Sequence, residues 1–255
     1  MASSPGVIAM EQDQPPQPQA HLASRAHTLV LVLLLLGVSV LTAKTPERVA
    51  ARNNRLPTYL ATMALEWALV AYVAWGVRKQ NVKVRELIGG RWGSPEDAIL
   101  DVAIAAGFWI LAIVVLSALG FAFGLSGKSN LETAKKSLEF LVPRTGLELG
   151  LWVALSATAG FAEEIIYRGY LQRQFAALAG NVYLGLLASA LLFGLSHGYE
   201  GPKRMVIIAV YGAMFGLVAK LRRSLRPGMM AHAWHDAATG VALYLIFVKH
   251  LVPMP

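Results

Sequence analysis

The sequence contains no cysteine and little charge. The absence of cysteine excludes disulfides, cysteine nucleophiles and thiolate metal sites. Charged residues make up 15% of the chain and apolar residues 56%, whereas an ordinary soluble domain carries about 25% charged residues. The mean hydropathy is +0.51. This deficit of charge argues against a soluble domain and indicates a polytopic membrane protein.

Several patterns that would indicate other functions are also missing. There is no heptad pattern, solenoid repeat or glycine-rich phosphate loop. No internal repeat supports an inverted-repeat transporter. The net charge of +8 comes from basic residues spread over the short polar gaps between apolar runs, so no nucleic acid is expected as a partner. These basic residues divide almost evenly between alternate loops, which leaves the membrane orientation open.

The apolar runs predict an all-α fold, a polytopic transmembrane helical bundle of about seven spans that encloses a polar cavity. The first run could instead be a signal peptide, because its length suits one and a weak cleavage-like site ends it; we prefer a span. The expected spans cover residues 28–43, 58–77, 98–125, 146–174, 181–197, 203–219 and 227–248.

The chain is expected to divide into three parts. Residues 1–24, rich in Pro and Gln, are predicted to be a disordered N-terminal tail. Residues 25–142 hold the N-terminal transmembrane helices and most of an amphipathic helix at the membrane interface, predicted within 126–144. Residues 143–255 hold the catalytic transmembrane helices.

Two shorter signals add detail to this division. Ser94 followed by Pro95 indicates the start of a helix. Gly212 and Gly216 form a small-xxx-small pattern, which allows close helix packing.

Residues 161–170 place two adjacent carboxylates, Glu163 and Glu164, inside an apolar run. Ionisable groups at membrane depth cost roughly 2.5–3.5 kcal/mol each on insertion scales, so they usually serve a function. On a helix Glu164 and Arg168 lie four residues apart and can pair. Glu163 then has no local cation. We expect Glu163 to perform chemistry and the Glu164–Arg168 pair to support it.

Three further ionisable residues, His197, His232 and Asp236, lie in the last spans. His232 and Asp236 are four apart and share a helix face. Glu163, His197 and His232 could hold a divalent metal such as zinc, which would activate a water. Alternatively, Glu163 takes the proton from water without a metal and the other groups stabilise the oxyanion. In both mechanisms a water attacks a carbonyl.

Two other residues are expected to contribute less. Glu66, inside the second apolar run, is interpreted as a paired packing group or a residue near the membrane interface. His235 is expected either to support the site from behind or to face lipid headgroups. The same residue types would also line a proton or ion pathway.

The motifs resemble those of the CPBP intramembrane proteases, the family of type II CAAX prenyl proteases and bacteriocin-immunity (Abi) proteins. The resemblance covers about residues 143–245 and rests on Glu163-Glu164-xxx-Arg168, Phe193-xxx-His197 and His232-xxx-Asp236, in this order. It implies a membrane-embedded helical bundle that hydrolyses peptide bonds.

The resemblance also implies a role for each residue. Glu163 would activate water with help from His197, and His232 with Asp236 would stabilise the oxyanion. Family members often have Asn where this chain has Asp236. An ionised carboxylate cannot donate a hydrogen bond. Asp236 is therefore protonated, accepts a proton from His232, or helps to hold a metal.

The expected function is that of an intramembrane endopeptidase in a multi-pass protein of the membrane, in a prokaryotic cell. Its partners would be membrane lipids and a peptide or prenylated-protein substrate, as in CAAX-type or bacteriocin processing. The alternative is a non-enzymatic membrane protein, such as an ion- or proton-coupled carrier or an immunity scaffold.

Overall fold

The computed structural model describes residues 21–44, 54–125 and 141–248, and this part of the chain is helical without strands. Most of the expected N-terminal tail and of the interfacial helix predicted within 126–144 lie outside the described residues. The elements are α1 (Arg25–Lys44), α3 (Leu56–Arg78), α4 (Val84–Ile88), α5 (Pro95–Ala122), α7 (Gly146–Glu163), η1 (Glu164–Leu171), α8 (Gln172–Ala179), α9 (Val182–Ser196), η2 (Gly198–Glu200), α10 (Pro202–Arg222) and α11 (Arg226–Phe247).

Five helical stretches are long and apolar enough to cross a membrane: α1, α3, α5, the continuous stretch from α7 to α8, and α10. The chain is thus a multi-pass integral membrane protein. The other two expected spans, α9 and α11, are helices but are not among these five. α9 is apolar but only 15 residues long, about 22 Å at 1.5 Å per residue. α11 is not among the five, because two histidines and Asp236 lower its hydropathy.

The region between α3 and α5 combines a confirmed prediction with a missed one. α5 starts at Pro95, and the Ser94 side chain caps it by accepting a hydrogen bond from the Asp97 amide at 3.4 Å. The preceding loop contains α4, which is only five residues long. Sequence periodicity does not resolve so short a helix.

The helix that carries the paired glutamates runs without a break from Gly146 to Ala179, a length of 34 residues. Its middle, η1, is π-helical, and all eight of its residues are buried. π-helices are rare and appear mostly as local bulges inside α-helices, often at functional sites.

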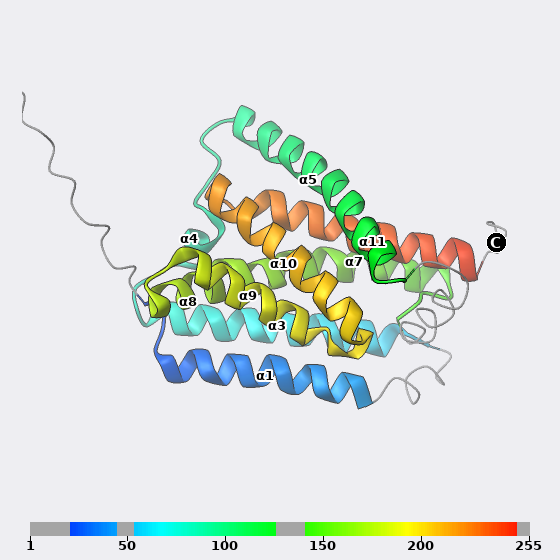
Figure 1. The fold of residues 1–255 in the computed structure, drawn as a ribbon, viewed down its shortest axis with the longest axis horizontal. Coiled ribbons are helices and arrows are strands. Elements are labelled where there is room, and N and C mark those ends of the chain that lie inside the picture. The colour runs from blue at the N-terminus through cyan, green and yellow to red at the C-terminus, as the bar shows by residue number, and fades with distance from the viewer. Residues whose placement is uncertain (1–20, 45–53, 126–140, 249–255) are drawn as a thin grey trace, which may run out of the picture.

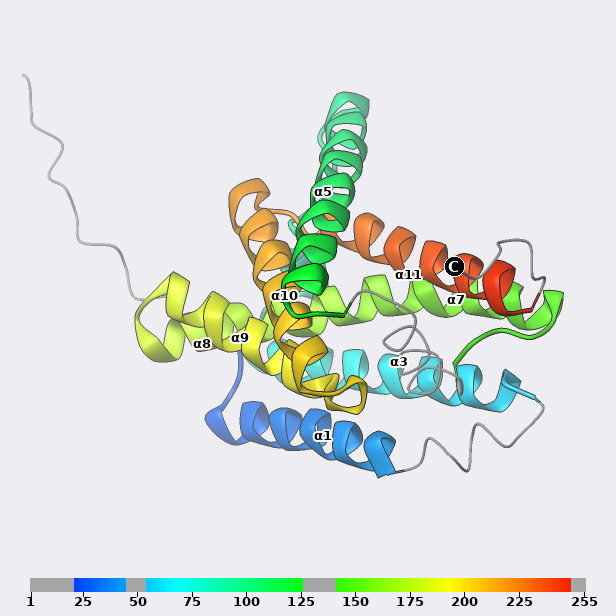
Figure 2. The same cartoon turned by 45° about the vertical axis from the view of Figure 1, so that its right-hand side comes forward.

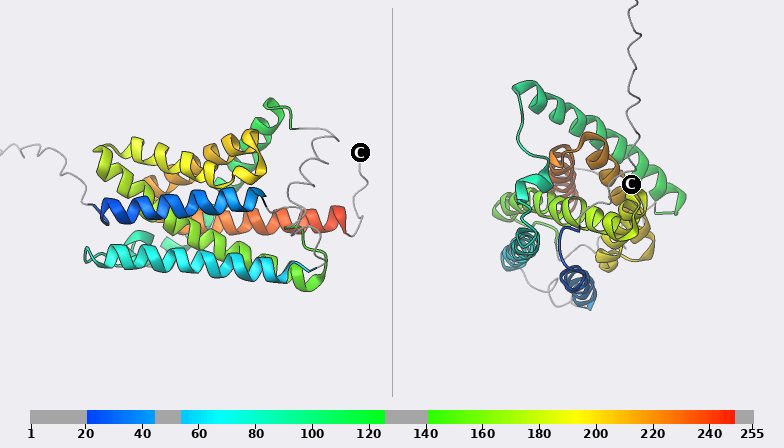
Figure 3. Two further views of the ribbon diagram at one scale, coloured as in Figure 1. Left: turned by 90° about the horizontal axis from the view of Figure 1, so that it is seen from below. Right: turned by 90° about the vertical axis from the view of Figure 1, so that its left-hand side faces the viewer.

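Figures 1 and 2 show α1, α3, α7 and α11 running along the long axis of the molecule, while α5 and α10 are inclined to it. Seen along that axis, α5 lies on the opposite side of the bundle from α1 (Figure 3). α7 packs against both α11 and α3, and α9 packs against α8 and α10. The long helix of the motif is therefore central to the bundle.

Close approach of two helix pairs depends on glycine. A Cβ on Gly160 would lie 2.7 Å from the Met229 carbonyl oxygen, so only glycine lets α7 approach α11 here. A Cβ on Gly212 would lie 3.2 Å from the Ala190 Cα, which confirms the close packing predicted for the small-xxx-small pattern on α10. The first contact sets Glu163 beside the middle of α11.

The corner after α9 is held by α1. The Ser39 hydroxyl donates to the Leu195 carbonyl at 2.9 Å and accepts from the Gly198 amide at 3.2 Å. Because His197 lies between these two residues, its backbone is fixed from outside its own helix.

Candidate active site

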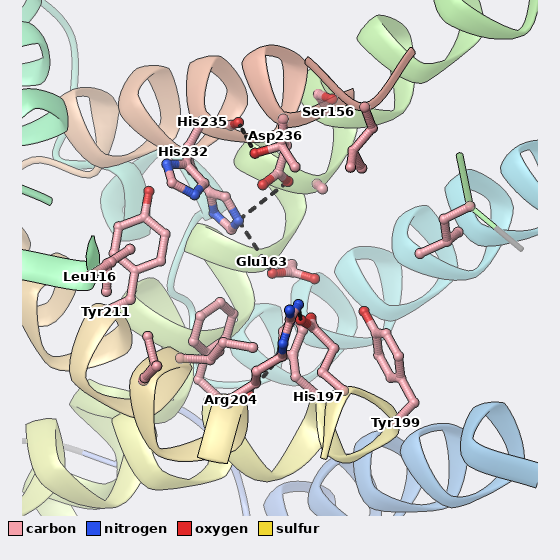
Figure 4. A pocket seen from close by; sticks show the side chains of 18 of the residues that line it. Leu116, Ser156, Glu163, His197, Tyr199, Arg204, Tyr211, His232, His235 and Asp236 are labelled. Carbon is pink, nitrogen blue, oxygen red and sulfur yellow. Dashed lines mark hydrogen bonds and ion pairs between the residues drawn. The ribbon is translucent and has the colours of Figure 1, made fainter. Parts of the chain in front are cut away.

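A cavity of about 560 Å³ lies inside the bundle, with walls from α3, α5, α7, α9, α10 and α11. Glu163, His197, His232 and Asp236, the four residues predicted to be catalytic, all line it. In Figure 4 the side chains of α11 face those of His197 and Arg204, with Glu163 between the two groups. The fold therefore brings together residues that lie up to 73 positions apart in the printed numbering, from Glu163 to Asp236.

Glu164 and Arg168 form the predicted ion pair. Their closest atoms, Glu164 Oε1 and Arg168 Nη1, are 2.7 Å apart, and both side chains are 1% exposed. A second guanidinium nitrogen donates to the Gly212 carbonyl on α10 at 3.1 Å. The pair thus links the motif helix to α10 and leaves Glu164 no access to the cavity.

The π-helical geometry around the pair has its own supporting bonds. Bonds from residue i to i+5 leave some carbonyls without their α-helical partners. The Ser189 hydroxyl donates to the Tyr167 carbonyl at 2.7 Å. The Tyr167 hydroxyl in turn donates to Ser196 Oγ at 2.8 Å. Both bonds tie η1 to α9, the helix that leads to His197.

His232 is surrounded by three carboxylates. Its Nδ1 lies 3.3 Å from Glu164 Oε1, and its Nε2 lies 3.7 Å from Glu163 Oε2 and 3.6 Å from Asp236 Oδ2. Carboxylate oxygens accept hydrogen bonds, so these contacts suit a ring that carries a proton on both nitrogens. Its Nε2–H would then point between Glu163 and Asp236.

The tautomer of His197 follows from its backbone contact. Its Nδ1 lies 2.8 Å from the Phe193 carbonyl oxygen. A carbonyl can only accept, so Nδ1 carries a proton. In the neutral tautomer with that proton, Nε2 would present a lone pair to the cavity.

Asp236 is held through its backbone as well as its side chain. The Trp152 indole donates to the Asp236 carbonyl at 2.7 Å. Its carboxylate Oδ2 lies 3.6 Å from His232 Nε2, within ion-pair distance of that ring.

Residues 145–238 match the model of the family described as type II CAAX prenyl endopeptidase Rce1-like. Residues 145–238 form an Rce1-like domain. The comparisons found no matching curated protein and no matching solved structure. The family implies a peptidase that works in the membrane, and it confirms the resemblance inferred from the three motifs.

The Rce1-like domain supplies more cavity residues than its motifs predict. Tyr199, the ion pair of Glu200 with Arg204, and His235 also line the cavity. Burial raises the pKa of the Tyr199 phenol well above its ordinary value, and the nearby Glu200 adds to this, so its hydroxyl keeps its proton. Tyr199 and Glu200 lie two and three residues after His197 in the sequence. This closeness to a motif residue is the signal that could have predicted their place in the cavity.

Several cavity residues lie outside residues 145–238, and Glu66 of α3 is the ionisable one among those described. Glu66 lines the same cavity as Glu163, although the sequence suggested a packing or interfacial role. Its place depends on α3 packing against α7, which no local pattern encodes.

The donor set does not fit the metal considered for Glu163, His197 and His232. Among residues 21–44, 54–125 and 141–248, no three His, Asp or Glu side chains are arranged to hold a metal ion. We therefore derive no step that passes through a metal.

Proposed function

We propose that this protein is an intramembrane endopeptidase in which Glu163 activates the attacking water. The observation that carries the proposal is the contrast between the adjacent glutamates. Glu164 forms an ion pair with Arg168, whereas Glu163 faces the cavity with one oxygen 3.7 Å from His232 Nε2. A carboxylate in this setting can take a proton from water.

The other residues divide the remaining work. His197 Nε2 accepts a hydrogen bond from the water and orients it towards the substrate carbonyl. The Nε2–H of His232 donates to the oxyanion that forms, and Asp236 balances the charge of that ring. Glu164 and Arg168 hold Glu163 and His232 in place.

The substrate reaches this site through an environment suited to membrane peptides. The cavity wall includes apolar side chains of α5 and α10, among them Leu116 and Ile207. We propose that α9 and α11 also lie within the membrane, giving seven helical passes, and that the substrate is a peptide or prenylated protein. Prenylated and unprenylated versions of one peptide would separate CAAX-type from general peptide processing.

The test is a cleavage assay in proteoliposomes with wild type, Glu163→Gln and His197→Ala. General acid–base groups contribute about 10²–10⁴-fold to rate. We expect Glu163→Gln to lose turnover by that factor with its thermal unfolding temperature unchanged, and a chelator to leave wild-type turnover unchanged. Unchanged turnover in Glu163→Gln would reject the mechanism. Proton flux without cleavage would favour a carrier.

A further inference from the structure

Glu66 is an ionisable group in the middle of α3, a helix suited to cross the membrane. It lies outside residues 145–238, so the family match assigns it nothing. Its side chain is buried, with 8% of the residue exposed, and it lines the cavity that holds Glu163. A carboxyl group at this depth is costly unless it has a partner or a function.

Most buried carboxylates in the described part of the chain have partners that explain them. Asp101, for instance, accepts from the Trp92 indole at 2.8 Å and from the Arg222 guanidinium at 2.7 Å. Glu164 also has an Oε2 without a hydrogen-bond partner, but its Oε1 pairs with Arg168. Glu66 differs, because its buried Oε2 has no hydrogen-bond partner and its side chain forms no ion pair among the described residues. An orphaned polar atom in the interior costs about 1–3 kcal/mol, so a ligand or substrate group would be its natural partner.

The ionisable neighbours of Glu66 belong to the proposed active site. Glu66 is within electrostatic reach of Glu163, His232 and Asp236. Like charges in one poorly solvated cavity repel, so a carboxyl group there without a cation partner favours its protonated form. Glu163 has the contact with His232 and a side chain that is 21% exposed. Glu66 is 8% exposed and its Oε2 has no hydrogen-bond partner among the described residues. Glu66 is therefore the carboxyl group suited to hold a proton for transfer.

We propose that Glu66 is the general acid that protonates the leaving amine, which extends the function proposed above. Water oxygen forms a bond to the substrate carbonyl carbon while Glu163 takes a proton from that water. The carbon–nitrogen bond then breaks, its electron pair goes to nitrogen, and the Glu66 carboxyl proton goes to the same nitrogen. The proton on Glu163 passes to Glu66, which restores both groups. The products are a carboxylic acid and an amine.

A pair of substrates with the same acyl part tests this role. One carries an amide leaving group, which must be protonated, and the other a nitrophenyl ester, whose nitrophenolate leaves as an anion. For Glu66→Gln we expect amide turnover to fall about 10²-fold or more and ester turnover to fall less than tenfold. Glu66→Asp should recover part of the amide activity.

The matched control is Glu148→Gln, another buried glutamate changed in the same way, which should leave the ratio of amide to ester turnover at its wild-type value. An equal loss on both substrates in Glu66→Gln, or no loss on the amide, would overturn the proposal. Glu163→Gln separates the two hypotheses. If it loses activity on both substrates, the proposed function holds whatever Glu66 does; if it keeps activity on both, that function fails.

Discussion

Two glutamates on one helix, Glu148 and Glu163, occupy opposite situations. Both oxygens of Glu148 accept backbone N–H groups, one from Arg55 and one from Arg144, each at 2.7 Å. Glu163 has only the longer contact to His232, and it faces a cavity. A carboxylate whose two oxygens both accept hydrogen bonds from the backbone stabilises the structure. A carboxylate that faces a cavity without such bonds is available for chemistry.

The same contrast separates the adjacent glutamates of the motif. Glu164 resembles Glu148 in being buried and bound, although its Oε2 has no hydrogen-bond partner among the described residues. That oxygen lies 3.1 Å from the point where a Cβ on Gly228 would stand, near the first turn of α11. The positive end of the α11 dipole favours a carboxylate there.

The largest predicted effect comes from removing the cation that pairs with Glu164. Arg168→Met removes the guanidinium and leaves a buried carboxylate without its charge partner, which costs about 3–5 kcal/mol. We expect a clear fall in unfolding temperature, measured by thermal unfolding in detergent, and loss of turnover in the cleavage assay. Arg173→Met is the control, because within the described ranges Arg173 donates only to the Glu86 carbonyl at the surface. Equal stability of the two variants would contradict the structural role given to Glu164.

A smaller effect is expected at Glu148. Glu148→Gln places an amide nitrogen, which cannot accept, against a backbone N–H, and this should cost about 1–3 kcal/mol. Cleavage per folded molecule should stay within about twofold of wild type. Glu86→Gln, at an exposed position, should change neither quantity. If Glu148→Gln lowered turnover as much as Glu163→Gln, the number of hydrogen bonds that each carboxylate accepts would not distinguish a structural glutamate from a catalytic one.

The smallest effect is expected at Asp236. Asp236→Asn keeps the size of the side chain, and Glu163 and Glu164 remain beside His232 to stabilise its charge. Turnover should therefore stay within about tenfold of wild type, a change of at most about 1.4 kcal/mol in the barrier. Complete loss of cleavage by a folded Asp236→Asn protein would show that the carboxylate itself is required.

Local patterns were enough to predict much of the site. The i, i+4 spacing predicted the Glu164–Arg168 pair, and the structure confirms it at 2.7 Å. Hydropathy predicted the five long apolar helices. The order of the three motifs identified the family. Their catalytic roles stay a prediction, although the fold gathers Glu163, His197, His232 and Asp236 around one cavity.

The features that could not be predicted depend on packing between distant segments. Glu66 reaches the cavity only because α3 packs against α7. The orphaned Oε2 is invisible in sequence for the same reason. The π-helical bonds of η1 differ from α-helical ones by a single residue of register, and the side chains of residues 164–171 carry no local signal for that choice. Length and composition identify five of the seven expected spans, because α9 is short and α11 contains site residues in place of apolar ones.

The π-helical stretch also determines where this chain can change length. An α-helix turns about 100° per residue, so deleting one residue in α7 or α8 would rotate everything beyond it away from its neighbours. A π-turn already holds an additional residue, and losing one there would restore α-geometry. The faces that α7 and α8 present to the bundle would then stay in register. A deletion between Glu164 and Arg168 would change the spacing of that ion pair. The overall packing of the helices would therefore survive a change of length that disrupts the site.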